Sequence, residues 1–517
     1  MNSQARAKTA QFYARNTYEL IFSSRSILNN KDIAEEVSNC STILAVSNPM
    51  LKAANMNSRV KTSLVNPPPL KGVYRHQLYI SIGLAYLAAI LEENGHEVNL
   101  IDCPASEIDL HQLKTKLAKS NPDLIGITSM TPTIQSALQT AHVAKETCPE
   151  STVVIGGPHA TFMDEQILKE EEGVDIVVRG EGEQTLLELA QNVTKSKDLS
   201  KIEGITFRHK QQKVRTPNRK HIQNLDELPL PAYKHFPLEK YRLFGRRILP
   251  IITSRGCPSQ CSFCTTSRIF GKAFRARSPQ NVVDELEWLK DSQGADAFSF
   301  YDDTFTLDKK RAIKICEEMK NRKIGIPWDC QTRVSQVSKE LLAKMREANC
   351  QQVFFGVESG CQEILNAVKK GTTVEQNEAA IRLAKKAGLF VAVSVMVGYP
   401  GETPEMLKQT IDLLRRTEPD DAYICVATPY PGTELRNLIE DSGWNISNDW
   451  KQYDTTTPVF NNPNLSAEDV TKIRNSFYDS FYSPKYVLHH MFKRNFYSRI
   501  MARTAMNHLI WRVKKIF

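Results

Sequence analysis

Short apolar runs alternate with amphipathic stretches along most of the 517-residue chain, and they fall into two series. In the first series, the stretches between the runs carry apolar residues three and four positions apart, as in Ile82–Asn94, Ile134–Thr147 and Glu183–Val193. Strands that alternate with helices predict a parallel sheet with helices on both faces. Five strands match the flavodoxin-like version of the doubly wound α/β fold. These runs are Lys61–Asn66, Glu97–Asp102, Asp123–Thr128, Thr152–Gly156 and Val174–Val178.

The second series begins at Leu249 and contains six more strand-like runs. Amphipathic helical stretches separate them: Pro279–Ser292, Lys309–Asn321, Lys339–Ala348, Val374–Ala387 and Pro404–Arg416. Six strand–helix units in a row predict a partial (β/α)6 TIM-like barrel, in which functional residues gather at the carboxyl ends of the strands. The six runs are Leu249–Ser254, Ala297–Asp302, Ile326–Gln331, Gln352–Glu358, Val391–Gly398 and Ala422–Ala427.

The pattern divides the chain into five parts. Residues 1–58 are polar and weakly patterned, which predicts a helical or partly disordered N-terminal extension. The doubly wound domain covers 59–195, a connector covers 196–248, and the barrel covers 249–442. Within the connector, Ile205–Arg208 and Lys213–Thr216 are expected to pair as a hairpin. Residues 443–517 are helical in places and basic.

The composition is that of a soluble globular protein with a formal net charge of +9. No run approaches the roughly 20 apolar residues that a bilayer crossing needs. The start, Met1–Lys8, lacks the apolar core of a secretory signal, so we expect a cytoplasmic location. The eleven cysteines are mostly scattered, and in a reducing compartment they predict no disulfide framework.

One group of cysteines is tight. Cys257, Cys261 and Cys264 follow the first barrel strand with the spacing C-x3-C-x2-C, and Gly256 and Pro258 let the backbone fold around a shared centre. A four-iron cubane needs one ligand for each iron, so three cysteines would leave one iron open to another ligand. The alternative is a structural zinc ion completed by a distant Cys or His. Structural zinc usually brings two Cys/His pairs, and no second pair is present here.

The cysteine loop after the first barrel strand, with aromatic Phe263 before the last cysteine, resembles the radical SAM superfamily over about residues 249–435. The resemblance implies a 4Fe-4S cluster whose open iron chelates S-adenosylmethionine (SAM). One electron from the reduced cluster would cleave SAM, and the resulting 5′-deoxyadenosyl radical would abstract a hydrogen atom from the substrate. Phe263 is accordingly expected among the SAM contacts.

The resemblance also implies SAM contacts at other strand ends. Asp302 and Asp303 would accept hydrogen bonds from the SAM ammonium group, although Asp303 is alternatively a helix N-cap. Arg333 would pair with the SAM carboxylate, or else form a surface ion pair. Glu358 would lie near the sugar or sulfonium, or else pair with an Arg or Lys of the barrel. Gly398 begins a glycine-rich turn that would let the backbone approach adenine.

Small residues also mark the strand ends of the first domain, where open α/β sheets bind ligands. This set resembles the cobalamin-binding domain found in one branch of the superfamily, and the turn at 428–435 resembles that branch as well. The domain is alternatively a degenerate copy that has lost its ligand, and His159 is alternatively a strand-end histidine without a cofactor contact. The residues implied for cobalamin are Ser129, Thr131, Gly156, Gly157, His159, Gly180 and Glu181.

One position departs from a common cobalamin pattern. Many cobalamin mutases and methyltransferases carry a cobalt-ligating His in D-x-H-x-x-G after the second strand. Here the corresponding run begins Asp102-Cys103-Pro104, and proline cannot ligate a metal. We therefore expect the lower axial position of cobalt to be empty or held by water.

The C-terminal tail is basic and aromatic. From Lys485 to Phe517 there are eight Lys or Arg residues and no acidic residue. A basic helix with aromatic residues is typical of a membrane-surface segment. The alternatives are a helix packed on the barrel and a basic face for nucleic acid. A membrane-surface segment would place the protein at the inner face of the membrane.

The resemblance implies an enzyme that modifies an unactivated carbon. We expect C-methylation of a hydrophobic small molecule such as a lipid or isoprenoid, with a reductase, flavodoxin or ferredoxin as electron donor and no nucleic-acid partner. The alternatives are an oxidative cyclase of the tetrapyrrole type and a non-catalytic cobalamin or metal sensor. A tRNA methylthiotransferase would need a second cysteine trio, but Cys40, Cys103 and Cys148 lie far apart in the sequence.

Overall fold

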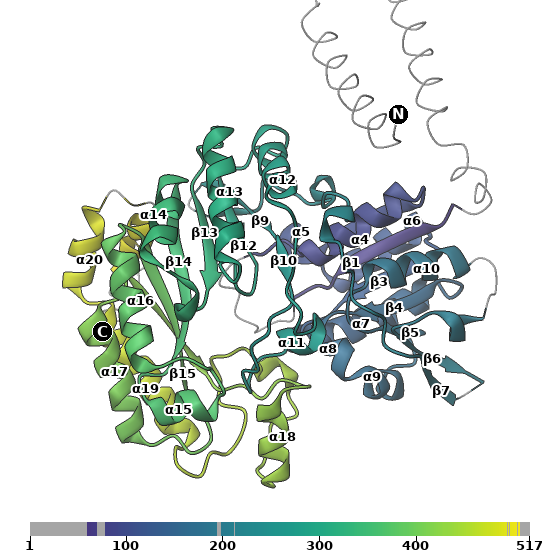
Figure 1. Cartoon of the computed structure of the whole chain (residues 1–517). Coiled ribbons are helices and arrows are strands. Elements are labelled where there is room, and N and C mark those ends of the chain that lie inside the picture. Colours follow the sequence, from purple (N-terminus) through teal and green to yellow (C-terminus); the bar gives the residue numbers. More distant parts are fainter. Residues whose placement is uncertain are drawn as a thin grey trace, which may run out of the picture. The chain divides into compact units, whose positions relative to one another are not determined.

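The computed structural model describes residues 59–506, apart from 70–77, 194–197, 211, 244, 494, 496 and 504. The predicted N-terminal extension and the last eleven residues of the tail therefore lie outside the described residues. Two seven-stranded sheets, each rich in parallel pairs, form the two main domains (Figure 1). The α/β fold class predicted from the sequence is thus confirmed.

The front domain is doubly wound, as predicted. Its five parallel strands lie in the order β2 (Glu97–Asp102), β1 (Lys61–Asn66), β3 (Leu124–Thr128), β4 (Thr152–Gly156) and β5 (Ile176–Val178). This 2-1-3-4-5 order is that of the flavodoxin-like fold. Apolar side chains of α4 (Ile82–Glu93) and α10 (Glu183–Val193) pack on one face of the sheet. Those of α6 (Leu110–Ser120) and α7 (Ile134–Thr147) pack on the other.

The hairpin predicted in the connector forms, but it belongs to the front sheet. β6 (Ile205–His209) pairs antiparallel with β5, and β7 (Gln212–Arg215) pairs with β6. Ile205 and Phe207 are buried in the front-domain core. Local alternation predicted the hairpin correctly, whereas its partner strand depends on contacts that the local sequence does not encode.

The second sheet is a curled partial barrel, which also confirms the prediction. Six parallel strands follow one another, and β8 (Arg242–Leu243) adds a short antiparallel edge next to β9. The first predicted run, Leu249–Ser254, is divided: Ser254–Arg255 form a separate strand, β10, that pairs with β11 (Arg275–Ala276). The parallel strands are β9 (Arg246–Ile251), β12 (Ala297–Phe300), β13 (Trp328–Thr332), β14 (Cys350–Glu358), β15 (Phe390–Val397) and β16 (Asp421–Val426).

Five helices cover the outer face of this sheet (Figure 1). In each, the residue before the helix accepts a hydrogen bond from a backbone N–H of the first turn through a Ser, Thr or Asp side chain, which satisfies a donor that the helix leaves free. The helices are α12 (Pro279–Asp291), α13 (Lys309–Asn321), α14 (Lys339–Glu347), α16 (Val374–Lys386) and α17 (Pro404–Thr417).

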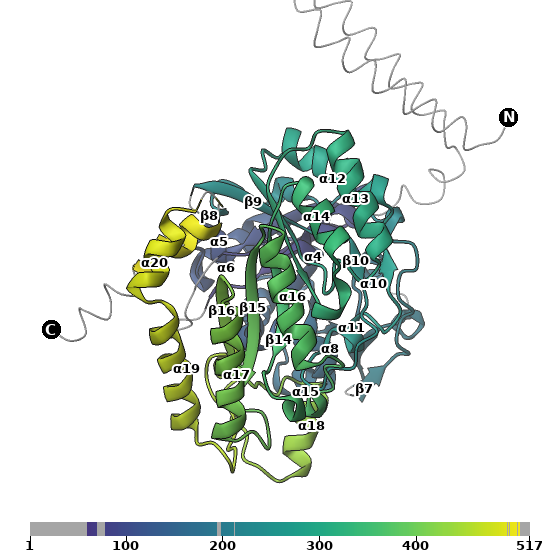
Figure 2. The same ribbon diagram turned by 60° about the vertical axis from the view of Figure 1, so that its left-hand side comes forward.

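The C-terminal region is helical and packs on the barrel. Helix α19 (Ala467–Phe481) runs beside α17 and the edge strand β16 (Figure 2). The Tyr478 hydroxyl accepts a hydrogen bond from the backbone N–H of Ile424 at 2.9 Å, and Arg474 donates to the Ile424 carbonyl at 3.2 Å. These contacts cover the edge of β16, whose backbone N–H and C=O groups could otherwise pair with another strand. Among the described residues, no helix combines the length and hydrophobicity that a bilayer crossing requires.

Candidate functional site

The cysteine loop is built at the carboxyl end of the barrel sheet, between β10 and the short helix α11 (Thr266–Ile269). Gly256 has φ +87°, and a Cβ there would collide with the carbonyl oxygen of Ala273, so the turn requires glycine. Ser262 holds the middle of the loop. Its N–H donates to the Val368 carbonyl at 3.0 Å, and its hydroxyl lies 3.0 Å from that of Tyr399.

The three cysteines are free and partly exposed on this loop. Burial raises the pKa of the Cys264 thiol. A single zinc ion with Zn–S bonds of about 2.3 Å would draw its thiolates to within roughly 4 Å of one another. In the described part of the chain, the metal-capable side chains whose ligand atoms come within 4.8 Å of one another are those of Asp420, His489 and His490, not the three cysteines. A wider spacing fits a cubane, in which each thiolate binds a different iron.

Arg333 lies beside the cysteine loop. Its Nη1 is 3.5 Å from the Sγ of Cys261, and its Nη2 donates to the Lys370 carbonyl. Sequence analysis left a surface ion pair as the alternative for Arg333, and the structure instead places its positive charge against a predicted cluster ligand. A guanidinium there would offset the negative charge of a thiolate-bound cluster.

The two aspartates after β12 differ in their surroundings. Asp302 is 1% exposed and accepts hydrogen bonds from the Thr253 N–H at 2.6 Å and the Ser254 hydroxyl at 2.8 Å. Asp303 is solvent-accessible and accepts a hydrogen bond from the Thr266 hydroxyl at 2.8 Å. Neighbouring protein atoms partly desolvate its carboxyl, and this raises its pKa to about 6. The N-cap of α13 is Asp308, so the N-cap alternative does not apply to Asp303.

Glu358, at the end of β14, forms the ion pair that sequence analysis left as its alternative role. Its Oε1 lies 2.7 Å from the Nζ of Lys370, and both side chains are buried. Glu358 has φ +63°, a conformation that is uncommon for a residue with a side chain. Strained residues are concentrated at functional sites. A contact between Glu358 and SAM stays a prediction.

The turn after β15 contains Tyr399 and Glu402, two residues that the sequence pattern did not single out. The N–H of Gly398, which has φ +80°, donates to Oε2 of Glu402 at 2.7 Å. Glu402 is fully buried, and burial raises its pKa to about 7. Tyr399 reaches the cysteine loop through Ser262, and Phe263 packs in the same apolar cluster as Tyr399. The turn therefore supports the cysteine loop through Tyr399. The contacts of Gly398 and Phe263 with SAM remain predictions.

At the front domain, the structure brings together the strand ends predicted to hold cobalamin. The Ser129 hydroxyl donates to the Gly156 carbonyl at 2.9 Å, and Gly157 has φ +105° with its Cα packed against the Ser129 backbone. The Gly180 N–H donates to the Thr161 hydroxyl at 3.1 Å. A Cβ at Gly180 would meet no atom within 4 Å, so space opens above the end of β5. Small residues with open space above them fit a large flat ligand.

His159 lies deeper than the open space. It is 2% exposed, its Nδ1 is 3.2 Å from the Thr131 hydroxyl, and its ring makes an edge contact with Trp450 at 5.0 Å between centroids. Burial lowers its pKa to about 4, so the imidazole is neutral at physiological pH. These contacts match the role of a strand-end histidine that sequence analysis left open, and a contact of His159 or Thr131 with cobalamin stays a prediction.

Pro104 lies where many cobalamin proteins have a cobalt ligand. Here the residues after β2 form the short helix α5 (Cys103–Ser106). The Asp102 carboxylate is held by the Asn66 amide at 2.9 Å and by the Tyr241 hydroxyl. The Asp102 carboxylate is thus held by protein groups, and the empty or water-held lower axial position of cobalt stays a prediction.

A substitution at Gly180 tests whether the open space holds cobalamin. We expect Gly180→Ala to weaken cobalamin binding at least tenfold, since overpacking by one methyl group typically costs ~1–3 kcal/mol. Gly95→Ala is a matched control, because Gly95 has a similar φ of +82°, also has open space at Cβ, and lies before β2. Titration of each variant with cobalamin, followed by absorbance, gives the comparison. Equal affinities for the two variants would contradict this location.

Glu181 connects the two domains. Its Oε1 lies 3.2 Å from Nη1 of Arg255 and 2.9 Å from Nη1 of Arg275, and its Oε2 accepts from the Ile222 N–H at 2.8 Å. Nη2 of Arg255 also lies 2.6 Å from Glu183. Because Arg255 is two residues before Cys257, the loop above β5 is tied directly to the cysteine loop. The Glu181 carboxylate is thus held in ion pairs, and its contact with cobalamin stays a prediction.

The inner face of the barrel sheet, opposite the five helices, carries aromatic side chains. The C-terminal segment covers part of it, where Tyr497 and Ile500 pack on Phe390 and Ala392. Tyr423 of β16 is 50% exposed, and its ring lies 5.5 Å from that of Phe354. Tyr79, which precedes α4 in the front domain, is 59% exposed. Burial and the nearby Asp329 carboxylate raise the pKa of the Tyr79 hydroxyl. Asp329 accepts a hydrogen bond from the Ser299 hydroxyl at 2.6 Å, and burial raises its pKa to about 6. Sequence analysis did not identify this surface.

Two family models match the chain: the Radical SAM superfamily over residues 251–414 and the B12 binding domain over residues 73–190. An uncharacterized methyltransferase of Pyrococcus horikoshii is 37% identical over 415 residues, which cover 80% of this chain and 90% of the relative. The chain belongs to the cobalamin-binding radical SAM family. As a radical SAM enzyme of this family, it uses a 4Fe-4S cluster, SAM and cobalamin as cofactors.

Relatives within the family differ in reaction. The anaerobic magnesium-protoporphyrin IX monomethyl ester cyclase of Rubrivivax gelatinosus is 33% identical over 421 residues, which cover 80% of this chain and 75% of the relative. The radical SAM methyltransferase TsrM of Kitasatospora setae, solved with cobalamin and a [4Fe-4S] cluster, has the same fold. Its TM-score is 0.67 at 19% identity, covering 84% of this chain and 90% of that one.

Proposed function

We propose that this enzyme transfers a methyl group to an unactivated carbon of a hydrophobic substrate, such as a lipid or isoprenoid, bound on the inner face of the barrel sheet. The observation that carries the proposal is the exposure of Tyr423 on that face beside Phe354, together with the exposed Tyr79, whose hydroxyl lies near the Asp329 carboxylate of the same sheet. Exposed aromatic side chains that gather on one face are typical of a site for an apolar ligand.

The proposed roles of the described residues follow from their contacts. When bound, the cluster and SAM supply hydrogen-atom abstraction, and cobalamin supplies a transferable methyl group. The Asp303 carboxylate accepts hydrogen bonds from the SAM ammonium group, while Arg333 holds positive charge against Cys261. The buried pair of Glu358 and Lys370 fixes the end of β14. The aromatic residues of the inner face exclude water from the substrate carbon.

The two adjacent aspartates give a paired test of the SAM site. We expect Asp303→Asn to raise the dissociation constant for SAM about tenfold or more, because a charge-assisted hydrogen bond contributes ~1.5–3 kcal/mol. Asp302→Asn should instead lower the thermal stability, since Asp302 is buried and accepts hydrogen bonds from residues 253 and 254. Calorimetric titration with SAM and thermal unfolding of both anaerobic holoenzymes separate the two effects. An unchanged SAM affinity in Asp303→Asn would remove Asp303 from the site.

A labelled methyl group tests the proposed reaction. The anaerobic, cobalamin-loaded enzyme is incubated with methyl-labelled SAM, a chemical reductant and an extract of lipids and isoprenoids. Label in a product, together with 5′-deoxyadenosine, is expected. Formation of 5′-deoxyadenosine with an unlabelled, oxidised product would instead favour the cyclase, the second candidate, which the 33% identity to the Rubrivivax gelatinosus enzyme supports.

The proposal also covers the electron donor and the cellular location. Reductive cleavage of SAM consumes an electron, and we propose a reductase, flavodoxin or ferredoxin as the donor. The proposed location is the cytoplasm, where such donors and reduced cysteines coexist. Replacing the chemical reductant with reduced flavodoxin or ferredoxin should support 5′-deoxyadenosine formation.

A further inference from the structure

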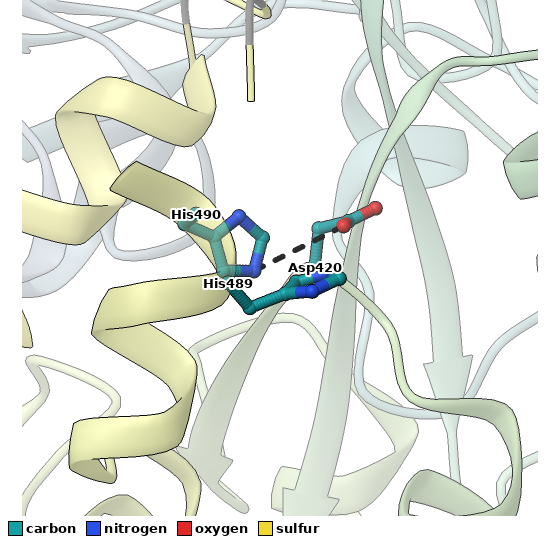
Figure 3. Close-up of side chains that lie close together, drawn as sticks. All are labelled: Asp420, His489 and His490. Carbon is teal, nitrogen blue, oxygen red and sulfur yellow. Dashed lines mark ion pairs between the residues drawn. The ribbon is translucent and has the colours of Figure 1, made fainter. Parts of the chain in front are cut away.

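Helix α20 (Pro484–Met491) is fixed to the barrel by one of its faces. The Tyr486 hydroxyl donates to the Asp420 carbonyl at 2.5 Å, and the Tyr486 and His490 rings lie 4.2 Å apart. His490 is 2% exposed, and its Nε2 is 4.0 Å from the Asp420 carboxylate. Figure 3 shows His489 and His490 on α20 and Asp420 directly before β16 of the barrel.

These groups anchor the helix rather than form a metal site. The ligand atoms of Asp420, His489 and His490 lie within 4.8 Å of one another, which is close enough for a shared ion. However, the Lys493 ammonium already lies 2.8 Å from the Asp420 carboxylate and supplies its counter-charge. The buried face of α20 is therefore fixed, and its other face points away from the barrel.

The outward face of α20 is apolar. Leu488 is 56% exposed, Met491 is 44% exposed and Phe492, directly after the helix, is 80% exposed. Their spacing of three and four residues places them on one side of the helix. Met506, farther along the chain, is 42% exposed. Soluble surfaces rarely gather large apolar side chains in this way unless they bind something.

The charges that the segment from Lys485 onward itself carries are all of one sign. Lys485 on α20 is exposed, as are Arg499 and Arg503 on the segment that follows. No acidic residue occurs between Lys485 and the end of the chain, which carries eight Lys or Arg residues over that stretch. Protein interfaces are depleted in Lys at their centre, whereas a basic face with exposed Phe and Leu is typical of helices that lie in the headgroup region of a bilayer.

We propose that Leu488, Met491 and Phe492, flanked by Lys485, Arg499 and Arg503, dock the enzyme on a membrane surface that contains anionic lipid. The apolar side chains enter the interface between headgroups and acyl chains, and the basic side chains meet the lipid phosphates. This docking goes beyond the proposed reaction, because it requires neither cofactor nor substrate.

The test uses the full-length, cofactor-loaded enzyme and two kinds of vesicle. One kind is pure phosphatidylcholine, and the other is an equimolar mixture of phosphatidylcholine and phosphatidylglycerol. We expect co-sedimentation with the mixed vesicles that weakens at high salt, and little with the neutral ones. The triple variant Leu488→Ser, Met491→Ser and Phe492→Ser should lower the partition coefficient by about tenfold or more.

Leu438→Ser is the matched control, because Leu438 on α18 (Glu434–Asp441) is a 43% exposed leucine outside this face. It should bind vesicles like the unchanged enzyme. Both variants should form 5′-deoxyadenosine without lipid at the unchanged rate, which shows that they fold and separates this test from that of the reaction. The proposal is overturned if the unchanged enzyme does not bind mixed vesicles, or if the triple variant binds them equally well. It is likewise overturned if the triple substitution converts a dimer to a monomer and leaves vesicle binding unchanged.

Discussion

Replacing Cys261 with alanine is expected to reduce 5′-deoxyadenosine formation to below about a thousandth of the unchanged rate, because the reaction depends on a complete set of cluster ligands. Cys261 is the cysteine that Arg333 approaches at 3.5 Å, so its loss removes both an iron ligand and the partner of that guanidinium. The Sγ is partly exposed, and its removal leaves no large cavity. Iron content after anaerobic reconstitution and 5′-deoxyadenosine yield are the two measurements.

Cys148→Ala is the control for this variant. Cys148 is also a free cysteine, but it is buried in the front domain, at the end of α7, away from the loop. It should retain its iron content and most of its activity. If Cys261→Ala keeps a full cluster and normal SAM cleavage, then the cysteine loop does not hold the cluster.

The cysteine loop could be predicted from the sequence because its ligands are neighbours in the chain. Cys257, Cys261 and Cys264 span eight residues, and their spacing alone limits the centres that they can bind. The strand order of the front sheet could be predicted for a similar reason, since strand–helix–strand units have one preferred hand and short connections.

The contacts that support the loop could not be predicted in this way. Arg255 meets Glu181 and Glu183 across 74 and 72 residues. Elsewhere in the barrel, Tyr497 reaches Asp329 across 168 residues. No local periodicity encodes such pairs. Asp302 and Asp303 are adjacent in the sequence, and what distinguishes them is the hydrogen-bond donors that residues 253 and 254 direct at Asp302. The sequence pattern identified the strand end but not which carboxylate remains available.

The C-terminal tail shows the same limit. Its basic and aromatic composition left a membrane segment, a packed helix and a nucleic-acid face as alternatives. In the described residues, Tyr497 and Ile500 are buried against Phe390 and Ala392 of the barrel, which supports packing. The exposed residues of α20 point away from that contact, so packing on the barrel and docking on a membrane use different faces of the same region.

Arg255→Ala is expected to be the most destabilising of the proposed substitutions, by about 3–5 kcal/mol. The side chains of Arg255, Glu181 and Glu183 are all less than 10% exposed. Burial alone would raise the pKa of Glu183, but Arg255, together with a backbone hydrogen bond and Arg275, outweighs it, and the net shift is downward. Without Arg255, the Glu183 carboxylate would remain buried without its main counter-charge, whereas Glu181 would keep Arg275.

Thermal and denaturant unfolding of the cofactor-free proteins measure this effect, with two comparison variants. Lys320→Ala breaks an exposed ion pair with Glu347 and should change the unfolding midpoint little. The double substitution Arg255→Met and Glu183→Met removes both charges, and it should recover much of the lost stability, because apolar residues can replace a buried ion pair. If Arg255→Ala unfolds like Lys320→Ala, the pair does not hold the two domains together. If instead it is destabilised and the double variant is restored, the uncompensated buried charge of Glu183 causes the loss of stability, and apolar packing between the cobalamin domain and the cysteine loop can replace the ion pair.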